Sequence, residues 1–143
     1  MTLQNLKSDA RVEGIEFKNG YLHFYYEDYF NDKIYEVRIK TDLCYVNYKL
    51  DEIAYEFCHI RQYKLADHLP IDEKSKLYIM PEGFIKQMKV ARQKYNLAIG
   101  LNSQEWKHFI QVYGDGLIIA CPVKSLENID IEEVGTIVNI NPN

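Results

Sequence analysis

The sequence lacks several features that would place a protein in a class at once. No stretch approaches the roughly 20 consecutive apolar residues that a membrane-spanning helix needs, and residues 1–9 lack the apolar core of a signal peptide. The net charge is −4, and no cluster of Lys and Arg is present of the kind that neutralises phosphate groups. We therefore expect a cytoplasmic protein that binds neither membranes nor nucleic acid.

Cysteine is scarce and does not occur in pairs along the chain. The three cysteines are Cys44, Cys58 and Cys121, and no Cys-x-x-Cys motif is present. Such widely spaced thiols are typical of a reducing compartment, where they stay free and mostly buried. A chain of 143 residues buries roughly two thirds of its unfolded surface. We therefore expect a single domain, residues 1–143, that folds without a disulfide, a metal or another cofactor.

Tyrosine, in contrast, is abundant. The chain has 12 Tyr, most of them in its first half. Tyrosine is well suited to β-strands, but it is also enriched at recognition surfaces because it offers a large contact area at low entropic cost. Both interpretations stay open at this point.

Alternating apolar and polar residues predict an antiparallel meander at the start of the chain. Residues 11–18, 21–29 and 34–40 alternate, and Asn19-Gly20 between the first two is a strong signal for a tight hairpin turn. One face of this meander should be wet. The other face should be buried through Leu22, Phe24, Tyr26, Tyr35, Val37 and Ile39.

A second hairpin is predicted in residues 105–123. Two runs rich in β-branched and aromatic residues flank Gly114-Asp115-Gly116, and Asp-Gly supplies the positive φ angles of a tight turn. Because these runs are apolar on both faces, the hairpin should lie in the middle of the fold and be covered twice. Alternatively, Asn102 caps a helix over residues 103–113 that Gly114 ends. The predicted faces are Trp106, Ile110 and Val112 on one side and Phe109 and Tyr113 on the other.

The remaining segments predict helices and connections. Residues 43–50 fit a strand or a helix, and their β-branched and aromatic content favours a strand. Residues 51–63 are expected to form a helix or an irregular turn, 77–80 a short strand, and 81–94 a helix that begins at Pro81. Residues 128–133 should be an acidic loop and 134–140 a closing strand. The predicted fold class is α+β: an N-terminal antiparallel β-meander and a central β-hairpin, with one or two helices packed on the sheet.

The chain carries, in this order, Tyr35-Glu36-Val37-Arg38-Ile39, Tyr48, Asp51-Glu52, Leu77-Tyr78 ahead of Pro81, His108-Phe109-Ile110-Gln111-Val112-Tyr113 and Ile118-Ile119-Ala120-Cys121. This order of pieces resembles a broad group of small bacterial α+β proteins, some of which are immunity proteins encoded beside polymorphic or contact-dependent toxins. The resemblance covers most of the chain as a pattern. It implies a cytoplasmic protein that binds and neutralises a toxin domain, and it implies no catalytic residues.

Three sets of residues could in principle carry chemistry. The first has donor types suited to zinc, but its spacing matches none of the usual ligand pairs, so we predict no metal site. The second pairs a thiol with an imidazole, yet the thiol lies in an apolar strand that favours an inert cysteine. The third could bind Mg²⁺, although alternating Glu and Lys is common on a wet sheet face. The sets are Cys44, Cys58, His59 and His68; Cys121 with His108; and Asp28 or Asp32 with Glu36 and Arg38, or equally Glu16-Phe17-Lys18.

The predicted function is therefore binding rather than catalysis. Exposed tyrosines beside acidic residues form an energetically favourable surface for a basic partner, here the cognate toxin domain. A small hydrolase or nuclease-like enzyme, and a homodimer whose tyrosine-rich face packs on itself, are the alternatives. The candidate partner-binding residues are Tyr21, His23, Tyr25, Glu27, Asp28 and Asp32.

Overall fold

The computed structural model describes residues 2–6, 9–48, 54–79 and 101–138. Across these ranges the chain forms eight β-strands, one short α-helix and two short 3-10 helices. The helices are η1 (Leu3–Asn5), α1 (Leu65–His68) and η3 (Leu126–Asn128). The strands are β1 (Ala10–Lys18), β2 (Tyr21–Asp28), β3 (Lys33–Lys40), β4 (Tyr45–Tyr48), β5 (Ala54–Lys64), β6 (His108–Gly114), β7 (Leu117–Val123) and β8 (Ile129–Thr136).

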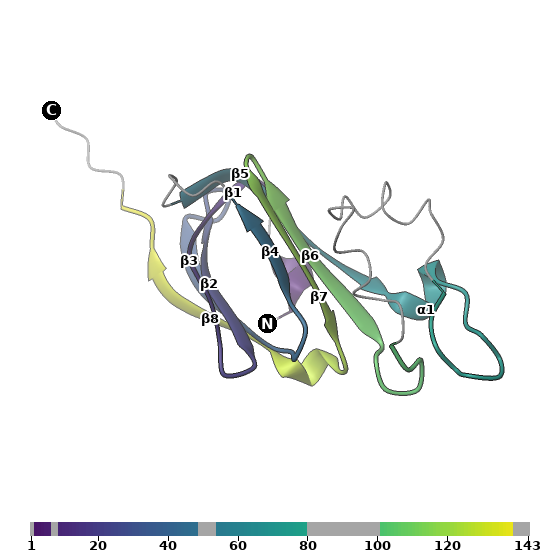
Figure 1. Ribbon diagram of the computed structural model, residues 1–143. Helices are drawn as coiled ribbons and strands as arrows, with labels where there is room; N and C mark the ends of the chain where they lie inside the picture. Colours follow the sequence, from purple (N-terminus) through teal and green to yellow (C-terminus); the bar gives the residue numbers. More distant parts are fainter. Residues whose placement is uncertain (1, 7–8, 49–53, 80–100, 139–143) are drawn as a thin grey trace, which may run out of the picture.

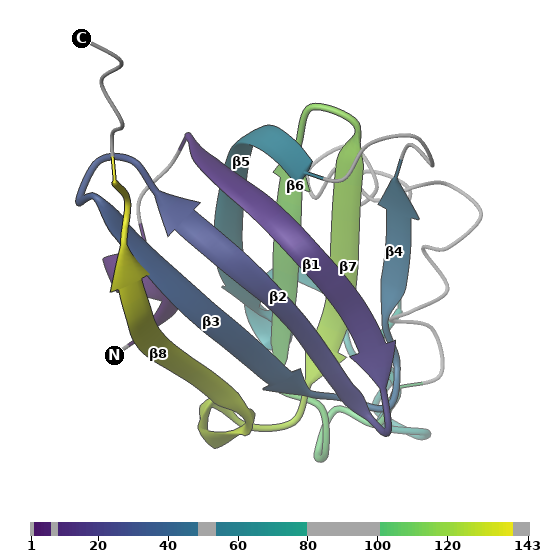
Figure 2. The same cartoon turned by 90° about the vertical axis from the view of Figure 1, so that its left-hand side faces the viewer.

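The strands form one open antiparallel sheet that curls over on itself. Their order is β4-β7-β6-β5-β1-β2-β3-β8. Strands β1, β2, β3 and β8 make one layer, and β4, β7 and β6 make the facing layer (Figures 1 and 2). Strand β5 belongs to both layers, because its first part pairs with β1 and its last part pairs with β6. The two inner faces enclose the core.

A β-bulge in β5 allows this strand to change layers. Cys58 lies opposite Ala10, and Tyr55 lies opposite Val12, so three steps along β5 match two steps along β1. Phe57 lies in the bulge with a φ of 57° and is 66% exposed. Such a bulge bends the strand and increases its twist.

The bulge also explains why the predicted helix or irregular turn over residues 51–63 is wrong. Tyr55 and Cys58 are both buried but lie three residues apart, which is the spacing of one helix face. A regular strand buries every second residue. The extra residue in the bulge changes this spacing to three, so the sequence pattern resembles that of a helix. Within this segment, residues 49–53 lie outside the described residues.

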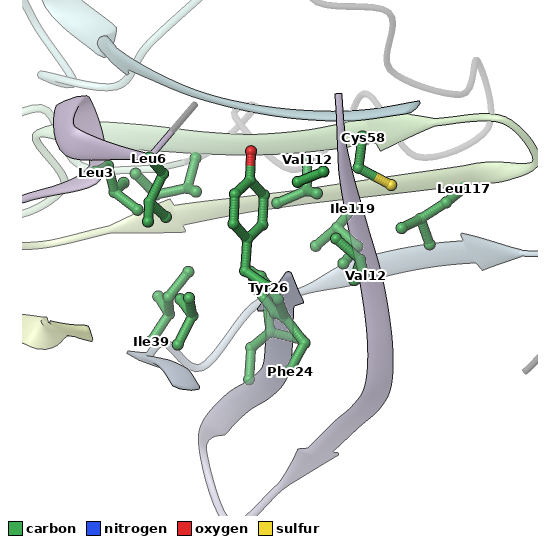
Figure 3. Close-up of a cluster of buried hydrophobic side chains, with 14 of the residues drawn as sticks. Leu3, Leu6, Val12, Phe24, Tyr26, Ile39, Cys58, Val112, Leu117 and Ile119 are labelled. Atoms are coloured by element: carbon green, nitrogen blue, oxygen red, sulfur yellow. The ribbon is translucent and has the colours of Figure 1, made fainter. Parts of the chain in front are cut away.

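The main core lies between the two layers, and Figure 3 shows part of it. Tyr26 of β2 extends toward Val112 of the β6–β7 hairpin, and Phe24 and Ile119 belong to the same cluster. The alternation predicted for β2 and β3 is confirmed, since all six residues expected inside are buried. The start of the chain also contributes, because Leu3 of η1 and Leu6, which follows η1, are buried in this core.

A second apolar cluster covers the other side of the β6–β7 hairpin. It includes Phe109 of β6 and Trp106, which precedes the strand. The Tyr78 hydroxyl donates a 2.6 Å hydrogen bond to the Trp106 carbonyl, which satisfies a buried polar group. The hairpin is therefore covered on both faces, as predicted, but Trp106 shares its cluster with Phe109 and not with Ile110. The full cluster is Tyr45, Leu65, Leu69, Tyr78, Leu101, Trp106, Phe109 and Ala120.

The predicted α+β class is wrong. The described residues form mostly antiparallel β-sheet, and their only α-helix is α1, a single turn. Within them no helix combines the length and apolarity that crossing a membrane would take. The helix expected over 81–94 lies outside the described residues, and the expected strand over 77–80 is limited to isolated bridges at Leu77 and Tyr78.

The predicted acidic loop over 128–133 is also wrong, since β8 occupies Ile129–Thr136. Ile129 and Ile131 pack against the core, while Asp130 between them and Glu132 after them are exposed. These two isoleucines fasten the edge strand β8 to the core. The acids beside them obscure the alternation of apolar and polar residues in the sequence. The two ambiguous segments contain the strands Tyr45–Tyr48 and His108–Gly114, whereas residues 43–44 and 103–107 are neither strand nor helix.

Candidate binding face

The solvent side of strands β1, β2, β3 and β8 carries charged and aromatic residues in register. We call this surface the outer face. Antiparallel pairing places side chains directly opposite one another on the same side of a sheet. Two rows run across all four strands: Glu16, His23, Arg38 and Asp130 form one, and Glu13, Tyr25, Glu36 and Glu132 form the other.

A shallow hollow of about 720 Å³ lies in the outer face. Tyr21 is 44% exposed at its edge, and the half-buried rings of His23 and Tyr25 meet edge to face with centroids 5.0 Å apart. These rings are held by a strand whose alternate residues are fixed in the core, so they have little freedom left to lose on binding. The hollow is lined by Glu16, Lys18, Asn19, Tyr21, His23, Tyr25, Glu36, Arg38 and Asp130.

Glu36 is the centre of the polar contacts in the hollow. Its Oε1 accepts a 2.8 Å contact from Arg38 Nε and lies 3.2 Å from His23 Nε2. The Arg38 contact is charge-assisted and therefore among the stronger kinds of hydrogen bond. These contacts orient the His23 ring beside Tyr25.

Three other acids of the outer face are not neutralised in this way. Glu16, Asp130 and Glu132 are exposed, and none of them forms an ion pair within the described ranges of the chain. The hollow therefore combines aromatic surface with carboxylates whose charge is available to a partner. Such an arrangement attracts basic groups.

The structure brings three of the six predicted binding residues together. Tyr21, His23 and Tyr25 line the hollow. Asp32 is exposed but lies in the turn between β2 and β3, with a φ of 55°. There its carbonyl accepts a 3.0 Å hydrogen bond from the backbone N–H of Ile137.

Glu27 also points to the outer side but belongs to a separate ionic cluster around Arg11. Arg11 lies 3.8 Å from both Glu13 and Glu27 and 3.6 Å from Glu56. The Tyr29 hydroxyl donates a 3.5 Å hydrogen bond to Glu27. Burial, reinforced by the neighbouring Glu13, raises the pKa of Glu27, while Arg11 opposes this shift. Glu27 is thus occupied by its neighbours, unlike the acids beside the hollow.

Asp28 is placed differently from the prediction, because it is fully buried at the inner end of β2. Its Oδ1 accepts hydrogen bonds from the backbone N–H groups of Phe30 and Asn31 at 2.9 and 3.2 Å. Its Oδ2 accepts a 2.9 Å bond from the Asn31 side chain. An aspartate in this position closes the turn by bonding to its own backbone, so Asp28 shapes the loop rather than presenting a charge.

Several residues of the hollow were not among the predicted binding residues. Glu36 and Arg38 were expected on the wet face, and their alternation with buried residues is confirmed. Asp130 is absent from the predicted set because the sequence predicts an acidic loop over residues 128–133. The signal that could have found it is the pair of isoleucines on either side of it.

The three alternative sets of reactive residues do not converge. Cys58 faces the core, where burial raises the pKa of its thiol to about 12, whereas the His59 ring stacks on Tyr113 with centroids 5.2 Å apart. Among the residues the structure describes, no group of three His, Cys, Asp or Glu could hold a metal ion.

The proposed thiol–imidazole pair and the carboxylate set are likewise separated. Cys121 lies opposite Ile110, while His108 lies opposite Val123 and bonds to Gln62 at 3.2 Å. In the carboxylate set, Asp28 is buried at the β2–β3 turn, whereas Glu36 and Arg38 lie on the outer face.

Comparison with protein-family models, with curated proteins and with solved structures found no match to this chain.

Proposed function

We propose that this protein is a binding module that docks a basic protein on its outer face, and that it acts as an immunity protein for a toxin domain. The observation that carries the proposal is the hollow itself, where Tyr21, His23 and Tyr25 lie among carboxylates. The resemblance in the order of the sequence segments suggests the toxin as the partner.

The chemistry of the hollow suits a partner that inserts an Arg or Lys side chain. The faces of Tyr21 and Tyr25 can stack against a cation, and Asp130 and Glu16 at the rim can neutralise it. Aromatic anchors surrounded by polar contacts are the usual composition of an energetic centre in an interface. The surplus negative charge also accelerates the encounter with a basic partner.

Inhibition would follow from occlusion. A toxin that acts on nucleic acid must present cations to phosphate groups, and an acidic sheet face can cover such a surface. The mechanism then requires no bond to be made or broken by this chain.

The first test is to use the tagged protein as bait in extracts of the native host and identify what stays bound. We expect a stoichiometric basic partner whose toxic activity is suppressed when this protein is bound to it. The double variant Asp130→Lys/Glu132→Lys should lose the partner, with an affinity loss of tenfold or more, because each change replaces attraction by repulsion.

Glu73→Lys is the matched control for Asp130→Lys alone, because it makes the same charge change at an exposed residue outside the hollow. Retention should stay at the wild-type level. If the double variant is folded and still retains the partner as well as Glu73→Lys does, the outer face is not the binding surface. Sedimentation of the isolated protein at rising concentration separates this proposal from a self-associating face.

A further inference from the structure

Two of the three thiols lie next to each other across neighbouring strands. Strand β4 pairs with β7 in the register Tyr45↔Ala120, Val46↔Ile119 and onward. Extending this register by one residue places Cys44 opposite Cys121. Opposite residues on antiparallel strands have Cβ atoms roughly 4.5–5.5 Å apart, close to the roughly 3.5–4.5 Å of a disulfide.

The side chains agree with this register. A hydrogen bond with the Cys44 side chain, together with burial, raises the pKa of the Cys121 thiol well above its ordinary value. Cys121 belongs to the main core, and Cys44 packs against the same core. The two sulfur atoms are therefore neighbours in the folded protein, and both are in the thiol form.

The two thiols differ in access. Cys121 is fully buried, whereas Cys44 is partly exposed just before β4. A disulfide in solution therefore has better access to Cys44 than to Cys121. Cys44 is therefore the thiol that would react with the oxidant first, and Cys121 is the thiol that would then react with oxidised Cys44.

We propose that Cys44 and Cys121 form a reversible disulfide that fastens strand β4 to β7, independently of the proposed binding function. The oxidant is a low-molecular-weight disulfide such as glutathione disulfide. In the first step the Cys44 thiolate attacks one of its sulfurs, a protein–glutathione bond forms, and one glutathione thiolate leaves. In the second step the Cys121 thiolate attacks Cys44 Sγ, the cross-strand bond forms, and the second glutathione leaves.

The balance of this exchange is complete. The protein loses two electrons, which reduce the glutathione disulfide, and its two thiol protons end on the two glutathione thiols. The second step should be slow at neutral pH, because only the thiolate attacks and the Cys121 thiolate is disfavoured. Its rate should rise with pH.

The position gives the bond a structural consequence. Strand β4 has four residues and lies at one edge of the sheet, and edge strands are where pairing is weakest and foreign strands can add. A neighbouring tether is already present, since the Thr41 hydroxyl donates a 2.6 Å hydrogen bond to the Pro122 carbonyl. The disulfide would add a covalent link between β7 and the segment just before β4.

The experiment incubates the folded protein in glutathione buffers of increasing oxidised fraction, at neutral and mildly alkaline pH. Free thiols are then blocked and counted by mass, and the cross-linked peptides are identified. We expect two thiols to disappear together, a peptide joining Cys44 to Cys121, and full reversal by a dithiol reductant. The melting temperature should rise by roughly 5–10 °C in the oxidised form.

The third cysteine supplies the control. Cys58 lies opposite Ala10, so the Cys58→Ala variant should form the bond as the wild type does. The Cys44→Ala variant should keep all its remaining thiols. Three free thiols in the fully oxidised buffer, a glutathione adduct on Cys44 that Cys121 never displaces, or a bond that forms only after denaturation would each overturn the proposal. A melting temperature measured in reductant confirms that each variant is folded.

Discussion

The outward sides of the two layers differ, because one is open to solvent and the other is covered by apolar side chains. The outer face over β1, β2, β3 and β8 is open and carries a hollow lined by tyrosine and acids. The outward side of β6 and β7 is covered by a second apolar cluster around Trp106 and Phe109. Both layers contribute their inner sides to the same core. Because the outward side of β6 and β7 is already covered by the chain itself, the open outer face is the side that is free to bind a partner.

The largest effect is expected when one aromatic ring is removed from each outward side and the two losses of stability are compared. Trp106→Ala should lower the free energy of unfolding by about 3–5 kcal/mol, because a nearly buried ring is lost from a packed cluster. Tyr21→Ala should change it by less than about 0.5 kcal/mol, since Tyr21 is exposed. Chemical denaturation of both variants measures the difference. Similar losses at the two positions would mean that the outer face is structural.

A second change tests the place where the layers join. A Cβ atom on Gly114 would lie 2.5 Å from Cys58 Sγ and 2.9 Å from the Glu56 carbonyl oxygen, at the bulge of β5. Gly114→Ala should therefore cost about 2–3 kcal/mol of stability, because backbone must move.

Gly135→Ala is a suitable control for that change. The nearest atom to its added Cβ would be Ile34 Cδ1 at 3.8 Å, which is an ordinary contact. Thermal melting of the two variants should separate them clearly. An equal effect would show that the tight approach at Gly114 is relieved at little cost.

The third prediction concerns the turn that closes the β2–β3 hairpin of the open layer. Asp28→Ala should lower stability by about 2 kcal/mol, since it leaves the N–H groups of Phe30 and Asn31 without their charged acceptor. Asp32→Asn should be nearly neutral, because Asn tolerates the left-handed conformation there. Urea titrations of both variants test this contrast. A loss at Asp32 alone would reverse the roles given to the two acids.

The smallest effect should appear in the pH dependence of stability. The pKa of Glu27 is raised in the folded state by burial and by Glu13, so the folded protein binds more protons than the unfolded chain near this pKa. This contribution to stability is therefore present below the unfolded pKa and is lost as pH rises through the folded one. Glu27→Gln should remove that loss, an effect of about 0.5 kcal/mol or less.

Asp72 offers a control, because its pKa is shifted in the opposite direction from that of Glu27. The Ser75 hydroxyl donates a 2.6 Å hydrogen bond to it and lowers the pKa of Asp72. Its contribution is thus present above the unfolded pKa and lost as pH falls. Asp72→Asn should flatten the stability curve at its acidic end, while Glu27→Gln acts at higher pH. Two variants that shift the curve in the same direction would contradict this assignment.

Local alternation was a good guide wherever it was uninterrupted. It placed the buried residues of β2 and β3 correctly, and it placed Tyr21, His23 and Tyr25 on the opposite side. It failed in β5, where one extra residue at Phe57 shifts the period, and in β8, where acids outnumber the two inward isoleucines. Three of the nine residues that line the hollow, Tyr21, His23 and Tyr25, were therefore predicted as binding residues, whereas the contribution of β8 was not predicted.

The sequence by itself determined the hairpins, because turn residues and period-two burial act between neighbours in the chain. Asn19-Gly20 and Asp115-Gly116 bring together strands that are adjacent in sequence. Only the tertiary structure decided which hairpins share a sheet, where β5 crosses between layers, and that Asp130 and Cys121 meet residues of the first half. Those pairings join segments far apart in the chain, and their register depends on fitting one shared core, which no local pattern encodes.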